Sequence, residues 1–173
     1  TAGTGGGRYG IADIVSFNNV GNIEFRGLNH GGIGFSRLNS LAFTNTGDIS
    51  FTDMKMGYSS NGGAIFINQG GNSSLYSNPG DGNISFDHTG SIIFRNLVKT
   101  SYYMSSAGIF TNEGSISFND TENILFENNT STGGPAAIGI GSIFLPDNHP
   151  SLSFSNIRGD IIFRNNKASG GSM

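Results

Sequence analysis

Carboxylate and imidazole side chains are the groups of this chain that could carry out acid–base chemistry. Cleavage of a polysaccharide by such groups needs at least two of them close together. The aspartates lie mostly in turns at differing points of the sequence pattern, and the histidines are isolated. The residues concerned are Asp48, Asp53, Asp87, Asp120 and Asp160, with His30, His88 and His149. We therefore predict that the protein is not an enzyme.

The sequence contains few residues in a pattern that could bind a metal ion or a cofactor. Cysteine is absent, which removes disulfides, thiol chemistry and cysteine-ligated zinc. The stretch NPGDG at 78–82 places carbonyl groups around Asp81 and could suggest calcium. The calcium-binding repeats of β-roll proteins recur, however, and this stretch does not. We predict no metal site and no cofactor.

The triplet Arg158, Gly159 and Asp160 has the composition of an integrin-binding motif. A second GDI sequence, at 47–49, indicates that Gly159 and Asp160 follow the pattern of the chain itself, so that only Arg158 is additional. Short motifs of this kind often arise by chance. Integrin binding is therefore kept as an alternative to a structural turn.

Four tyrosines lie in the stretches between the regular segments of the chain. They are Tyr58, Tyr76, Tyr102 and Tyr103. Because tyrosine is enriched at protein interfaces, we consider them candidate partner contacts, with packing inside their own loops as the alternative.

Charged residues make up only 12% of the 173 residues, the net charge is −3, and no block of either sign occurs. Nucleic acids and anionic membrane surfaces both attract clustered lysine and arginine, so neither is an expected partner. No apolar stretch is long enough for a membrane-spanning helix. The chain opens at TAGTGGG without a methionine and stops at KASGGSM, and we expect it to be a fragment of a longer protein.

A three-residue unit, apolar–x–Phe, recurs in five pairs along the chain, and the members of a pair lie eight residues apart in four pairs and nine in the last. The pairs are Val15/Phe17 with Ile23/Phe25, Leu41/Phe43 with Ile49/Phe51, Ile84/Phe86 with Ile92/Phe94, Ile116/Phe118 with Ile124/Phe126, and Leu152/Phe154 with Ile161/Phe163. After each pair comes a variable stretch and then a glycine-rich entry to a third apolar segment, as in NGGAIFI at 61–67. Such a period indicates a repeat architecture.

Residues two apart on a strand point to the same face, so the apolar residue and the phenylalanine of each unit point inward together. The gaps between the units are too long for two-residue hairpin loops, and the strands are too short to stand alone. We predict an all-β fold, a right-handed parallel β-helix of about five coils with three short strands per coil, in which Ile stacks on Ile and Phe on Phe. Asparagine, which tolerates left-handed backbone angles, and glycine, which allows close approach, are expected at the corners.

The whole chain, 1–173, is predicted to be a single β-helix domain. Residues 1–13 would form an N-terminal edge, and the coils would cover about 14–40, 41–75, 84–112, 116–148 and 152–173, the fifth without its third strand. The loops before each glycine pair vary in length, at 52–61, 95–105, 127–132 and 164–169. Insertions in solenoids gather on one side, which is often the binding face.

The sequences GGAI at 62–65, FENN at 126–129 and FRNN at 163–166 resemble the GGA(I/L/V) and FxxN repeats of the chlamydial polymorphic membrane proteins. The stretches HGGI, SAGI and GGPAAI are degenerate copies, and the resemblance extends from about residue 14 to the end. Proteins of that family are autotransporters. A signal peptide leads a repeat-rich passenger, and a C-terminal outer-membrane β-barrel carries the passenger to the surface, where it serves as an adhesin.

The resemblance implies a passenger segment on the bacterial outer-membrane surface, or extracellular, that binds host cells through a receptor protein. Membrane attachment would then come only from a C-terminal barrel outside this chain. The residues that match the adhesion motifs are Gly62, Gly63, Ala64, Ile65, Phe126, Asn129, Phe163 and Asn166. The alternative, which we favour, is that these residues serve the architecture alone. The alternatives are a structural or self-associating stalk without receptor contact, and a carbohydrate-active β-helix enzyme.

Overall fold

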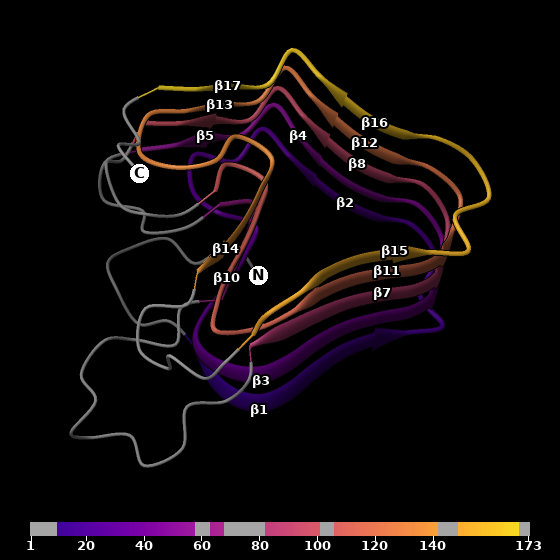
Figure 1. The fold of residues 1–173 in the computed structure, drawn as a ribbon. Coiled ribbons are helices and arrows are strands. Elements are labelled where there is room, and N and C mark those ends of the chain that lie inside the picture. The colour runs from indigo at the N-terminus through magenta and orange to yellow at the C-terminus, as the bar shows by residue number, and fades with distance from the viewer. Residues whose placement is uncertain (1–9, 58–62, 68–81, 101–105, 142–148, 170–173) are drawn as a thin grey trace.

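The structure is a computed structural model, which describes residues 10–57, 63–67, 82–100, 106–141 and 149–169. Within these ranges all regular structure is β-strand, with seventeen strands and no helix. Every pairing between strands is parallel, and each joins one coil to the next. The predicted fold class, an all-β parallel β-helix, is confirmed, and Figure 1 shows its coils lying over one another around a common axis.

Two stacks of strands carry the apolar–x–Phe units. The first strands of the coils are β1 (Gly10–Asn18), the second half of β3 (Ile33–Thr46), β7 (Asn83–Thr89), β11 (Ile116–Thr121) and β15 (Leu152–Ser155). The second strands are β2 (Ile23–Arg26), β4 (Ile49–Thr52), β8 (Ile92–Arg95), β12 (Ile124–Glu127) and β16 (Ile161–Arg164). A corner of a few residues separates the two stacks in every coil.

The glycine-rich segments form a third stack, and two-residue strands form a fourth. The third comprises the first half of β3, β6 (Ile65–Ile67), β10 (Ile109–Asn112) and β14 (Ile138–Gly141). The fourth comprises β5 (Lys55–Met56), β9 (Val98–Lys99), β13 (Thr130–Ser131) and β17 (Lys167–Ala168), and it precedes the glycine-rich segment in the chain. The sequence pattern gave no sign of these short strands, because two residues are too few to show a period.

Strand β3 turns a corner without interruption. Its residues Ile33–Phe35 pair with β6, whereas Ser40–Thr46 pair with β7. The glycine-rich stack and the first-strand stack therefore belong to one sheet, in the order β14-β10-β6-β3-β7-β11-β15, with β1 also on β3.

The pairing register places identical side chains on top of one another inside the coil, as predicted. Ile49, Ile92 and Ile124 are partners in successive coils, and so are the phenylalanines two residues later. Adjacent rings in the two phenylalanine columns lie 4.8–5.1 Å apart between centroids and 1–6° from parallel. A stacked pair contributes about 0.5–1.5 kcal/mol beyond the burial of its apolar area.

The corner after each phenylalanine follows one rule. The residue two positions after Phe has a positive φ, between 48° and 65°, in all ten cases, and nine of the ten are asparagine, aspartate or glycine. These residues are Asn19, Asn45, His88, Asp120 and Asn156 after the first strands, and Gly27, Asp53, Asn96, Asn128 and Asn165 after the second. Asparagine and aspartate adopt a positive φ more readily than other residues with a side chain. The prediction of asparagine and glycine at the corners is confirmed.

Glycine is required where the third strand begins. A Cβ atom at Gly31 would lie 2.7 Å from the Gly63 carbonyl oxygen, and one at Gly32 would lie 2.7 Å from the ring of Phe51. Gly63 meets the backbone of Ser106 and Gly108 in the same way. The predicted close approach of the glycine-rich segments to the neighbouring coil is therefore confirmed.

We expect Phe94→Ala to lower the free energy of unfolding by about 3–5 kcal/mol, because its ring is fully buried between the rings of Phe51 and Phe126. Urea unfolding followed by circular dichroism would measure the change. Ser85→Ala, at an outward position of β7, is the matched control and should change stability by less than about 0.5 kcal/mol. An equal loss in both variants would contradict the role assigned to the phenylalanine column.

Candidate functional site

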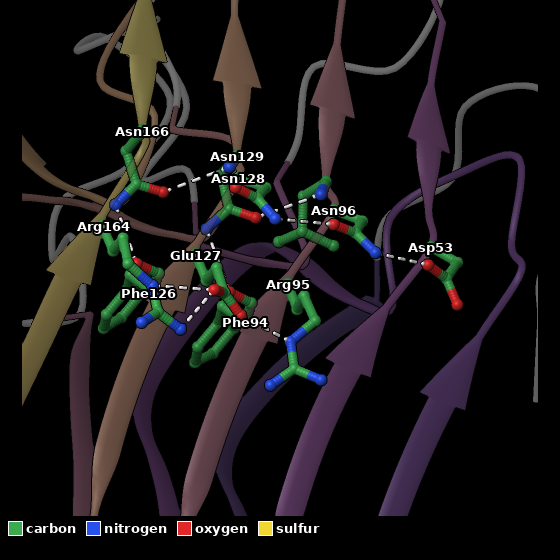
Figure 2. Close-up of polar contacts among 11 residues, drawn as sticks. Asp53, Phe94, Arg95, Asn96, Phe126, Glu127, Asn128, Asn129, Arg164 and Asn166 are labelled. Atoms are coloured by element: carbon green, nitrogen blue, oxygen red, sulfur yellow. Dashed lines mark hydrogen bonds and ion pairs between the residues drawn. The ribbon is translucent and has the colours of Figure 1, made fainter.

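The FxxN motif at 126–129 lies inside the coil. Phe126 and Asn129 are both fully buried. The Asn129 side chain donates from Nδ2 to the Phe94 carbonyl at 3.0 Å and accepts at Oδ1 from the Leu97 N–H at 3.0 Å, so it clamps its own corner to the preceding coil (Figure 2). A buried amide without such bonds would be strongly unfavourable.

The FxxN motif at 163–166 repeats this clamp one coil later. Asn166 donates from Nδ2 to the Phe126 carbonyl at 2.8 Å, and its Oδ1 accepts from the Asn129 N–H at 3.1 Å (Figure 2). Phe163 differs from Phe126 in being 51% exposed, since among the described residues only one side of its ring is covered by another coil.

The same corner position carries apolar side chains in the earlier coils. Leu28, Met54 and Leu97 stand three residues after their phenylalanines, where Asn129 and Asn166 stand later in the chain. Met54 and Leu97 are fully buried, and Leu28 packs against the core. The corner is therefore filled either by an apolar side chain or by an asparagine whose amide bonds to the neighbouring backbone.

The GGAI motif also points inward. Gly62 lies outside the described residues, whereas Gly63, Ala64 and Ile65 are all buried. Ile65 stacks between Ile33 and Ile109, and the Ala64 and Ile65 N–H groups donate to the next coil at 2.9 and 3.0 Å. In the described part of the chain, the motif residues of the inner coils thus offer little side-chain surface to a partner.

The RGD triplet is held against the preceding coil. The Gly159 N–H donates to the Glu122 carbonyl at 2.7 Å, and the Asp160 N–H donates to Asn123 Oδ1 at 3.0 Å. The Arg158 side chain lies along the solenoid, with Nε 3.2 Å from Asp120 Oδ1 and Nη2 donating to the Thr89 carbonyl at 3.3 Å. About half of the Arg158 side chain is exposed, but its guanidinium is already paired.

His88 is not isolated, so that prediction is wrong. Its Nδ1 lies 3.1 Å from Asp87 Oδ1, and its Nε2 lies 3.1 Å from Asp120 Oδ2 on the next coil. A hydrogen bond of 2.6 Å from Asn119 is the main cause that holds the pKa of Asp87 below its usual value, burial opposes it, and His88 contributes further. The sequence could not show this cluster, because Asp87 and Asp120 stand at different positions of their repeats.

The two carboxylates at the His88 corner both have partners on a neighbouring coil. Asp120 lies 3.1 Å from His88 and 3.2 Å from Arg158, and Asp87 accepts a hydrogen bond from Asn119. Among the residues that the structure describes, no group of three or more His, Asp or Glu side chains is arranged to hold a metal ion. Asp81 and the four candidate tyrosines, Tyr58, Tyr76, Tyr102 and Tyr103, lie outside those residues.

A charged ladder on the outer face of the second strands was also not foreseen. Arg95, Glu127 and Arg164 stand at the same position of three successive strands, one residue after the phenylalanine. Arg95 Nε lies 2.9 Å from one Glu127 oxygen, and Arg164 Nε donates to the other at 2.8 Å (Figure 2). The alternation FR, FE, FR at equivalent positions is the signal that could have revealed it.

Lys99 is fully buried in the stack of two-residue strands, where its partners in register are Met56 and Ser131. Burial disfavours the charged ammonium group, which lowers the pKa of Lys99 to about 8. A lysine at this position is a further residue that the repeat pattern did not mark, because the short strands themselves were missed.

In comparisons with known proteins, no family model, no curated protein and no solved structure matches the chain. None of the described residues forms a helix that could cross a membrane.

We expect Asn129→Ala to lower the free energy of unfolding by about 2 kcal/mol, because it leaves the Phe94 carbonyl and the Leu97 N–H without their buried partner. Chemical denaturation would measure the loss. Glu122→Ala, on the exposed corner of the same coil, is the control and should be nearly neutral. Unchanged stability in Asn129→Ala would argue against the clamp.

Lys99 should make stability rise with pH. Between about pH 8 and pH 10.5 the unfolded chain still holds the proton that folded Lys99 has lost, so the free energy of unfolding increases with pH over this window. The rise is up to about 3 kcal/mol. Urea unfolding across this range, compared between the wild type and Lys99→Met, isolates the effect. A rise of the same size in Lys99→Met would assign it to other groups.

Proposed function

We propose that this chain is a surface-exposed segment of a bacterial autotransporter passenger and that it binds host cells by protein–protein contact. The observation that carries the proposal is the placement of the repeat motifs. Their side chains hold successive coils together, so the repeats build a rigid rod and leave binding to the positions that vary between coils.

Segments of differing length enter each coil at the same place. Residues 57–64 join β5 to β6, residues 100–108 join β9 to β10, and residues 132–137 join β13 to β14. A longer segment, 68–82, follows β6. In a solenoid, insertions at one side commonly form the binding face, and three of the candidate tyrosines fall in the first two joins.

A second candidate function is self-association as a structural stalk. The last described coil favours it, since Leu152, Ile161 and Phe163 are each 42–51% exposed. A hollow of about 540 Å³ is lined by Leu152 and Phe163, with Pro135, Ala136 and Ile138 also in its wall. Apolar surface of this kind on the end of a solenoid suits a further coil or a second copy. A sedimentation profile that depends on concentration would favour this function over a monomeric adhesin.

The adhesive function predicts saturable binding of the labelled, purified chain to cultured epithelial cells, displaced by unlabelled chain. Circular dichroism run in parallel must show β structure. Exchange of residues 57–62 or 100–105 for residues 132–134, which keeps Gly63 and Gly108, should weaken binding about tenfold or more if that segment makes contact, with the fold retained. Absence of binding by the folded chain would overturn the adhesive function.

The RGD triplet supplies an internal comparison for the same assay. Asp160→Glu should leave binding unchanged, because the Asp160 backbone is fixed in a corner and Arg158 is paired with Asp120. Loss of binding in this variant, with unchanged stability, would instead favour integrin as the receptor.

A further inference from the structure

The outward positions of three neighbouring second strands are apolar. Ile93 of β8, Leu125 of β12 and Ile162 of β16 are partners in register, so they form a row across three coils. Ile162 is 37% exposed, and Ile93 and Leu125 are half-buried against each other and their neighbours. We name these three residues the outer apolar stripe.

The stripe departs from the pattern of the rest of the solenoid. The first strands of the same three coils carry Ser85, Ser117 and Ser153 at the equivalent outward position. The second strands of the two preceding coils carry Glu24 and Ser50 there, and Ser50 is the direct neighbour of Ile93 in register. Polar residues are therefore compatible with a strand at this position. Strand geometry alone does not explain why three consecutive coils carry apolar residues there.

The stripe has a charged rim with a positive excess. Two guanidinium groups, those of Arg95 and Arg164, share the single carboxylate of Glu127. The Glu127 side chain is only 13% exposed, whereas Arg95 and Arg164 are 44% and 57% exposed. Outward along this edge, a partner would therefore meet two arginines with donors to offer, and the carboxylate between them is covered (Figure 2).

We propose that the outer apolar stripe, with Arg95 and Arg164, is a contact surface for a host-cell protein segment that presents apolar side chains next to a carboxylate. This inference rests on the proposed adhesive function and adds a second surface to the variable segments. The apolar row would supply burial, and the arginines would supply bidentate, charge-assisted hydrogen bonds to the acidic group. Arginine is one of the residue types that contribute most of the binding free energy at protein interfaces.

The test is cell binding by Ile93→Ser/Leu125→Ser, which copies the serine that the chain already carries at Ser50. We expect binding about tenfold weaker or more, with the circular dichroism of the wild type and urea unfolding that remains cooperative although it occurs at lower urea. Arg164→Gln should weaken binding and reduce its dependence on salt, because one ionic contact is lost. The matched control is Ser117→Ala, on the outward face of the first strands, which should bind like the wild type.

Each other outcome overturns a defined part. If the wild type binds and the stripe variants bind equally well, the outer apolar stripe is not a contact surface, and the adhesive function is unaffected. If the folded wild type does not bind, both are overturned. Binding that survives protease treatment of the cells would overturn a protein partner. If the double variant does not unfold cooperatively, the binding assay is repeated with Ile162→Thr, which keeps a β-branched residue on β16. Binding of Ile162→Thr equal to that of the wild type would then contradict the role of the stripe.

Discussion

The in-register contact between successive coils is the constraint on which the rest of this structure depends. Strands of neighbouring coils lie about 4.8 Å apart, so each inward side chain must fit directly on the residue above and below it. The simplest solution is the same side chain in every coil, and the two phenylalanine columns show it, with centroid separations close to the strand spacing. The corners obey the same constraint, because every coil must turn at the same point to remain in register.

This constraint changes how the repeat motifs of the chain are interpreted. A motif that recurs because each coil must match its neighbour indicates packing between coils. Asn129 is an example. Its amide replaces the apolar side chain of Leu97 and recovers the cost of burial through two bonds to the preceding coil. Information about partners therefore lies in positions that differ between coils, such as the segments of variable length and the outward residues of the second strands.

Local spacing was enough to predict the stacked elements, whereas contacts between different repeat positions were not foreseen. The pairing of Ile84 with Ile116 was predictable because each is the first residue of an apolar–x–Phe unit. His88 and Asp120 follow the same corner rule, but their pairing depends on the side chains reaching across coils at one particular register. Lys99 was missed for another reason: its strand has two residues, and a burial pattern cannot be detected over that length. The continuous path of β3 around its corner likewise has no local signal.

The direction of the strand pairing also has a mechanical consequence. Because each strand pairs with strands of neighbouring coils, the ladder hydrogen bonds run along the axis of the solenoid (Figure 1). A pull on the ends of the rod loads those bonds one coil at a time, so the coils would peel away in succession and release chain in steps. A rod of this kind would lengthen in steps under tension, which limits the peak force along it.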